Sequence, residues 1–299
     1  MKPIAFLALT LSMAARAGEF APVDSPAVIG QTFVTQFVSA PFPHSSRTNG
    51  HKYKDEFFPA DKNYSDSSVS VFIPNGFGNE SSVDFVIHFH GWRNTTTGAM
   101  EQFKLREQLI ASHRNAILIV PQGPQNAPDS SGGKLEDMDG FKRFMDEAML
   151  TLKQRGTINK NAHVGQIILS GHSGGYQVMS SIVERGGLSD EIKEVWLFDG
   201  LYAQEEKFLA WSQKTGGRLV NIYTDNGGTK VRTEEMFYLL KQRGSNVLVT
   251  TDAAISIADL STNRFVFLHT DMSHNDVLEK RRTFQKFLET SCLKEKPSK

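Results

Sequence analysis

The chain has 299 residues, 39% of them hydrophobic, so it can bury a substantial core, and intrinsic disorder is excluded as its main state. Its 33 basic residues balance 33 acidic residues, which predicts no nucleic-acid partner. The single cysteine, Cys292, leaves no internal disulfide and no cysteine-based metal cluster. We therefore expect a fold that is held by packing alone.

The first 17 residues have the pattern of a signal peptide. Lys2 precedes an apolar run over residues 4–15, which is too short to span a membrane. Small residues at Ala15 and Ala17 match the positions that signal peptidase reads, so we expect cleavage near Ala17. No cysteine follows the run, and no later stretch is apolar enough for a span, so we expect no membrane anchor. The pattern predicts an exported protein, periplasmic or secreted, with a buried N-terminal helix as the alternative.

Composition divides the rest of the chain in two. Residues 18–64 are rich in Pro, Ser, Asn and Phe without periodicity, which predicts an irregular N-terminal arm with one or two edge strands. Residues 65–299 alternate strand and helix patterns, which predicts one α/β domain with a mostly parallel sheet covered by helices on both faces. The expected strands are 68–73, 83–89, 116–120, 164–170, 194–199, 218–224 and 264–269, and the expected helices are 99–112, 140–155, 176–186, 205–213, 233–243 and 276–290.

A candidate nucleophile lies between one of these strands and the next helix. Residues 171–175 read Gly-His-Ser-Gly-Gly, which matches the pattern G-x-S-x-G and places Ser173 at the apex of a strand–turn–helix. The glycines remove side chains where strand and helix nearly touch, and the first amides of the helix suit an oxyanion. An ordinary serine in a glycine-rich connection is the alternative.

Together with His90-Gly91 after an earlier strand, this segment resembles the α/β-hydrolase superfamily over roughly residues 68–290. Within that superfamily the chain is most similar to exported bacterial serine esterases and depolymerase-like hydrolases. The resemblance implies a three-layer α/β-hydrolase fold. It also implies a serine, an acid and a histidine in that order, with the acid after a late strand and the histidine after the last.

The serine needs a histidine base, and the histidine needs an acid that fixes its tautomer. Only His269 and His274 follow Ser173, and His274 lies in a polar loop after the last expected strand, so we expect His274 to be the base. Asp225 closes the strand that most members of the superfamily use for the acid, and it is the expected partner of His274. Asp199 closes the preceding strand and stays the alternative acid.

Two backbone amides are expected to hold the oxyanion. The resemblance implies Gly174 as one donor, and Trp92 or Arg93 as the second. The residues expected to contact substrate are His90, Gly91, His172 and Tyr176. Four aromatic residues next to expected strand ends could line the pocket or belong to the core: Trp92, Tyr176, Phe198 and Tyr202.

A metal site is the competing interpretation of one strand. His88 and His90 are two residues apart and share one face, as the first ligands of some zinc sites do. No helical metal motif accompanies them, so we expect no metal and no cofactor. We expect His90 to brace the oxyanion loop and His88 to pack in the sheet. The long loop 121–134 at a strand end is typical of a substrate-binding loop.

These patterns predict a serine hydrolase that cleaves carboxylic esters through an acyl-enzyme. The expected substrate is a small-molecule ester or the end of an ester polymer, and no protein partner is evident. Only a short stretch separates residues 199 and 218, which predicts no large lid. The alternatives are a peptidase or amidase with the same residues, and a binding protein that keeps the fold without turnover.

Overall fold

The computed structural model describes residues 29–297. The predicted signal peptide, residues 1–17, lies outside the described residues and stays a prediction. Within the described range, no helix has the length and apolar character needed to cross a membrane.

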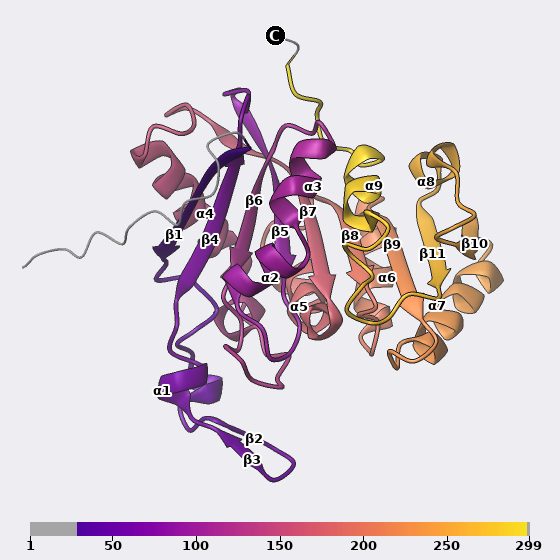
Figure 1. Ribbon diagram of the computed structural model, residues 1–299, viewed down its shortest axis with the longest axis horizontal. Helices are drawn as coiled ribbons and strands as arrows, with labels where there is room; N and C mark the ends of the chain where they lie inside the picture. The colour runs from indigo at the N-terminus through magenta and orange to yellow at the C-terminus, as the bar shows by residue number, and fades with distance from the viewer. Residues whose placement is uncertain (1–28, 298–299) are drawn as a thin grey trace, which may run out of the picture.

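Nine of the eleven described strands form a central sheet in the order β1-β4-β6-β5-β7-β8-β9-β11-β10 (Figure 1). The pairs β1–β4 and β4–β6 are antiparallel, and every other neighbouring pair is parallel. This arrangement confirms the predicted mostly parallel sheet, and it gathers the carboxyl ends of the parallel strands at one edge. The strands are β1 (Gly30–Gln36), β4 (Ser68–Pro74), β5 (Ser82–Phe89), β6 (Ala116–Pro121), β7 (His163–His172), β8 (Ile192–Phe198), β9 (Arg218–Thr224), β10 (Val247–Thr251) and β11 (Phe265–Thr270).

Helices cover both faces of the sheet, because its central strands are apolar on both sides. In β7, Ile167 and Leu169 belong to one hydrophobic core, whereas Ile168 between them belongs to the other. Burial on both faces confirms the three-layer architecture. One core contains residues of α4 (Gly140–Gln154), α5 (Tyr176–Arg185), α6 (Glu205–Thr215) and α7 (Lys230–Gln242), and the other contains residues of α2 (Thr96–Gln102), α3 (Leu105–Ala111), α8 (Ile257–Thr262) and α9 (Thr283–Glu289).

The structure differs from the sequence-based elements in three places. The expected helix 99–112 is two helices, because Lys104 adopts a left-handed conformation with φ of 47° between them. The expected helix 276–290 begins only at Thr283, after Arg282 with φ of 53°. The strand β10 and the helix α8 were not predicted, since β10 is a half-buried edge strand whose short pattern is weak.

The predicted N-terminal arm contributes to the sheet and to its carboxyl edge. Strand β1 pairs in register with β4 as an edge strand. The chain then forms the β2–β3 hairpin (His51–Tyr53 and Glu56–Phe58) and the short helix α1 (Ala60–Asn63), which project beyond the sheet in Figure 1. Phe42, Phe58 and Tyr64 pack with Ala127 in a small separate core. The boundary at residue 64 stays a prediction, and the arm packs on the loop after β6.

A buried ion pair ties the arm to that same loop. Arg47 donates from Nε to Asp129 Oδ2 at 2.6 Å and from a terminal nitrogen to Oδ1 at 3.0 Å. The Asp129 side chain is only 7% exposed. Burial alone would raise the pKa of this carboxyl, but the hydrogen bonds from Arg47 outweigh burial and the pKa is lowered. Asp129 is therefore ionised at neutral pH and depends on Arg47.

We expect Arg47→Met to lower the free energy of unfolding by about 3 kcal/mol at pH 7, because it leaves a buried carboxylate without its partner. The pKa of Asp129 is lowered by folding, so this contribution is full above the unfolded value of about 3.9. It is lost as the pH falls through the folded value. Urea unfolding of both proteins at pH 7 and pH 3 measures the difference.

The matched control is Lys142→Met, which removes an exposed ion pair with Asp146. We expect its urea midpoint to equal that of the wild type. A change in midpoint for Arg47→Met no larger than that of Lys142→Met would contradict the structural role of the Arg47–Asp129 pair.

Candidate active site

Ser173 lies on a sharp turn at the carboxyl end of β7. The strand ends at His172, a 3-10 turn covers Ser173–Gly175, and α5 begins at Tyr176. Ser173 has φ of 52°, a left-handed conformation that non-glycine residues seldom adopt. A Cβ on Gly175 would lie 2.6 Å from the carbonyl oxygen of Phe89, so only glycine allows this close approach to β5. The predicted strand–turn–helix around Ser173 is confirmed.

Asp199, directly after β8, holds the side chain of His274. The carboxylate is fully buried, and its Oδ2 lies 2.7 Å from His274 Nδ1. Thr224 donates its amide to Oδ1 at 3.2 Å and its hydroxyl to Oδ2 at 2.7 Å, and the hydroxyl of Thr229 donates to Oδ1. Since the carboxylate accepts the proton on Nδ1, it leaves Nε2 of His274 as the basic nitrogen.

Hydrogen bonds keep Asp199 ionised although it is buried. Burial alone would raise its pKa, but the hydrogen bonds from His274, Thr229 and Thr224 outweigh burial, and the pKa is lowered. The loop after β9 closes on the same carboxylate: a Cβ on Gly227 would lie 1.8 Å from Asp199 Oδ2. This loop therefore requires glycine at position 227.

The expectation that Asp225 is the partner of His274 is corrected by this geometry. The side chain of Asp225 is 50% exposed, accepts a hydrogen bond from Lys230 Nζ at 2.7 Å and lies 3.1 Å from His269 Nε2. Hydrogen bonds from Lys230 and then His269 lower its pKa. Thr224, the last residue of β9, turns its side chain toward Asp199, whereas Asp225 next to it turns to the surface. The alternative acid, Asp199, is the residue that contacts His274.

His172 supports the loop that carries His274. Its ring is 4% exposed, and its Nε2–H donates to the backbone carbonyl of His274 at 2.9 Å. The two rings have centroids 4.7 Å apart. Burial, and then the nearby His274, lower the pKa of His172 to about 4, so the ring is neutral at neutral pH. A substrate contact by the His172 side chain does not fit this burial, and that expectation is corrected to a supporting role.

Gly174 and Trp92, the two expected oxyanion donors, lie next to each other in the structure. Gly174 belongs to the 3-10 turn that leads into α5. Amides at the start of a helix have no acceptor within the helix. A Cβ on Gly174 would lie 2.7 Å from Trp92 Cδ1, so the two residues are adjacent. The amide of Arg93 already donates to the carbonyl of Ala127 at 3.0 Å, whereas no acceptor for the Trp92 amide is found in residues 29–297. The geometry favours Trp92 over Arg93.

His90 braces the segment that precedes Trp92. Its Nε2 accepts the amide of Gly123 at 3.0 Å, and its Nδ1–H donates to the carbonyl of Gly91 at 2.8 Å. Burial lowers its pKa, against the opposing effect of the Gly91 bond, so the ring is neutral. Gly91 itself lies against the nucleophile, since a Cβ there would be 2.8 Å from Ser173 Cβ. The side chain of His90 is 7% exposed and fits bracing better than the expected substrate contact.

His88 lies in the sheet, away from the reacting groups. It is fully buried, its Nδ1 lies 2.9 Å from Ser170 Oγ, and its ring contacts Phe103 and Phe284 edge-on. In the part of the chain that the structure describes, no three His, Cys, Asp or Glu side chains gather closely enough to hold a metal ion.

Two pairs of aromatic side chains pack in the segments around Ser173. Trp92 is 44% exposed and contacts Tyr53 of the β2–β3 hairpin at a centroid distance of 5.1 Å. Tyr202 packs against Tyr176 at 5.6 Å. Phe198, in contrast, is fully buried in the core. The sequence did not predict the contact of Tyr53 with Trp92, because an irregular segment carries no pattern that indicates a distant partner. It also did not predict the contacts of Thr224 and Thr229 with Asp199.

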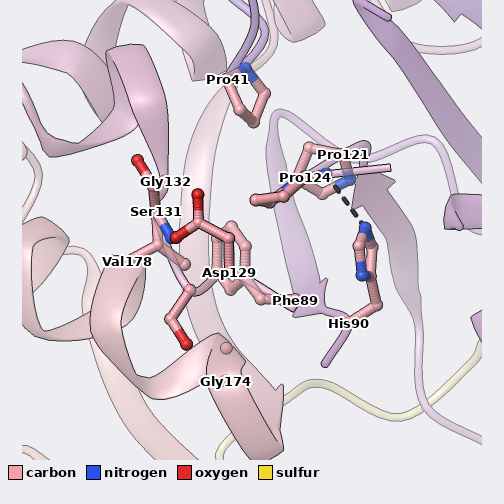
Figure 2. A pocket seen from close by; sticks show the side chains of 13 residues that line it. Pro41, Phe89, His90, Pro121, Pro124, Asp129, Ser131, Gly132, Gly174 and Val178 are labelled. Atoms are coloured by element: carbon pink, nitrogen blue, oxygen red, sulfur yellow. Dashed lines mark hydrogen bonds between the residues drawn. The ribbon is translucent and has the colours of Figure 1, made fainter. Parts of the chain in front are cut away.

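A small cavity of about 20 Å³ adjoins Gly174 (Figure 2). That is room for about one water molecule. Gly174 and Val178 of the nucleophile segment line one side, and Pro121 and Pro124 line the other. Asp129 reaches this cavity as well, but its charge is already paired with Arg47. The predicted substrate-binding loop 121–134 thus lies directly beside the candidate oxyanion donor.

Comparison with known proteins gives the fold. No family model and no curated protein sequence matches the chain. A feruloyl esterase module from Clostridium thermocellum, solved with sinapinate, matches with a TM-score of 0.52 and 11% identity, over 90% of this chain and 92% of its own. An S-formylglutathione hydrolase from Staphylococcus aureus matches with a TM-score of 0.52 and 8% identity, over 88% of this chain and 98% of its own. The chain has the α/β-hydrolase fold.

We expect the ring of His172 to stay neutral until the pH falls to about 4. An unfolded histidine titrates near pH 6.5, so between these values the unfolded chain binds more protons at this residue. The contribution of His172 to stability is therefore full above about pH 6.5 and falls as the pH drops toward 4. NMR titration of the histidine rings measures the pKa directly, and a His172 resonance that titrates near pH 6.5 would contradict the buried, neutral assignment.

Proposed function

We propose that this chain is an exported serine hydrolase that cleaves carboxylic esters, with Ser173 as nucleophile, His274 as general base and Asp199 as the acid of the triad. The contact that carries the proposal is the 2.7 Å bond between Asp199 and His274. Ser173, in its strained turn, directly follows His172, whose ring donates to the backbone carbonyl of His274. A serine at the apex of a turn, a histidine base and a buried carboxylate are together the three groups that activate a hydroxyl at neutral pH.

In the proposed reaction, Ser173 Oγ attacks the ester carbon while its proton moves to His274 Nε2. The carbonyl oxygen becomes an oxyanion and accepts hydrogen bonds from the amides of Gly174 and Trp92. His274 then gives the proton to the leaving alcohol, and an acyl-enzyme on Ser173 remains. Water loses a proton to His274, attacks the acyl carbon, and the carboxylic acid leaves as Ser173 recovers its proton.

Asp199 serves this cycle through its charge and its position. His274 becomes a cation each time it accepts a proton, and the ionised carboxylate at 2.7 Å stabilises that cation in a site where water screens poorly. The bond to Nδ1 also keeps Nε2 directed to the reacting atoms.

Two features support an exported esterase. The predicted signal peptide supports export to the periplasm or outside the cell. The two solved structures described above are named as a feruloyl esterase module and an S-formylglutathione hydrolase, which supports acyl transfer from oxygen or sulfur over a peptidase or amidase. The proposed substrate is a small ester or the exposed end of an ester polymer.

We expect a fluorophosphonate probe to label Ser173, because only an activated serine attacks phosphorus at a useful rate. Intact mass and peptide mapping of the purified mature protein identify the labelled residue. Ser173→Ala should lose labelling and ester turnover while it keeps the wild-type melting temperature. Ester turnover at the wild-type rate by Ser173→Ala would overturn the proposal.

We expect Asp199→Asn to lower kcat roughly ten thousandfold, because the amide cannot hold the reactive tautomer of His274 or stabilise its cation. Asp225→Asn is the matched control, since it makes the same chemical change on an exposed carboxylate, and its kcat should stay close to the wild-type value. Initial rates on 4-nitrophenyl acetate, beside melting curves of both variants, measure the contrast. A larger loss for Asp225→Asn would reverse the assignment of the acid.

A further inference from the structure

The phenol of Tyr202 joins the nucleophile to the loop that encloses Asp199. Its hydroxyl donates to the carbonyl of Gly227 at 2.8 Å, and Gly227 is the residue that packs directly on the carboxylate of Asp199. Tyr202 lies near Ser173, because its amide donates to the carbonyl of Gly200 at 3.0 Å and a Cβ on Gly200 would lie 3.1 Å from the carbonyl oxygen of Ser173. Burial raises the pKa of Tyr202 above its ordinary value, although Ser173 opposes this, so the phenol is protonated at neutral pH.

These contacts fix what Tyr202 offers to a bound substrate. A phenol has one proton to donate, and the carbonyl of Gly227 takes it. The phenol oxygen can therefore only accept. When Ser173 attacks an ester, its proton goes to His274, so Ser173 offers no donor to the oxygen of Tyr202. A half-buried acceptor without a donor is costly, so a substrate that supplies one is favoured at that moment.

The position of Tyr202 indicates which half of the ester would supply the donor. The oxyanion donors Gly174 and Trp92 are adjacent to each other, whereas Tyr202 contacts Gly227 beside Asp199, on the side of the acid and the base. His274 must reach the oxygen of the leaving alcohol to protonate it. The alcohol half of the ester therefore lies on the side of Tyr202.

We propose that Tyr202 is a specificity-determining residue that accepts a hydrogen bond from a hydroxyl next to the ester in the alcohol half of the substrate. The substrate class is then the ester of a polyol or sugar whose neighbouring hydroxyl is free. This proposal rests on the proposed serine esterase function and deepens it. The rings of Tyr176 and Tyr202, which pack at a tilt of 46°, add apolar surface beside the same position.

The test compares two esters that differ in one group. In 2-hydroxyethyl acetate the alcohol half ends in a hydroxyl, and in propyl acetate a methyl group takes its place. We expect wild-type enzyme to prefer 2-hydroxyethyl acetate in kcat/KM by about fivefold or more, and Tyr202→Phe to lose most of that preference. The readout is the ratio of the two kcat/KM values, because general damage to the acid loop would lower both rates together and leave the ratio unchanged.

Tyr223→Phe is the control variant, because it also removes one phenol hydroxyl. Tyr223 precedes Thr224, and its ring packs against His269 instead. Its ratio should equal that of the wild type. A ratio that is unchanged in Tyr202→Phe, or a wild-type enzyme without preference for the hydroxyl ester, would overturn the role of Tyr202 alone. Absence of fluorophosphonate labelling at Ser173 would overturn both proposals, so the two failures are distinguishable.

Discussion

The buried carboxylate of Asp199 is the group on which the rest of the site depends. A charge without solvent is tolerated only when hydrogen bonds replace its hydration, and here donors come from Thr224, Thr229 and His274. These donors belong to different segments of the chain. The end of β9, the start of α7 and the loop after β11 therefore meet around the two carboxylate oxygens of Asp199. The same carboxylate leaves no space for a side chain at Gly227.

The part of the site that sequence could predict is the part that is local. The turn around Ser173 follows from neighbouring glycines between a strand and a helix, and His274 follows from its place after the last strand. The choice between Asp199 and Asp225 depends instead on which way two adjacent side chains turn where β9 ends. That direction is decided by Thr224 and by the loop that packs on the carboxylate, and no periodic pattern records it.

The contacts of the N-terminal arm likewise could not be predicted from the sequence. Its hairpin sends Tyr53 against Trp92, and its Glu56 forms an ion pair with Arg93 at 2.7 Å. Both partners directly follow Gly91, in the segment that carries the candidate oxyanion donor. A segment without periodicity thus becomes a wall of the candidate site, because contacts between distant residues decide its conformation.

The bond between His172 and the backbone of His274 joins residues 102 positions apart. Synthesis runs from the N-terminus, so the turn that bears Ser173 leaves the ribosome long before its base does. An unfinished chain that stops short of residue 274 therefore contains Ser173 without His274, and the ring of His172 has no His274 carbonyl to bond. Under the proposed mechanism, the capacity to attack an ester arises only when the last tenth of the chain has been made and has folded into place.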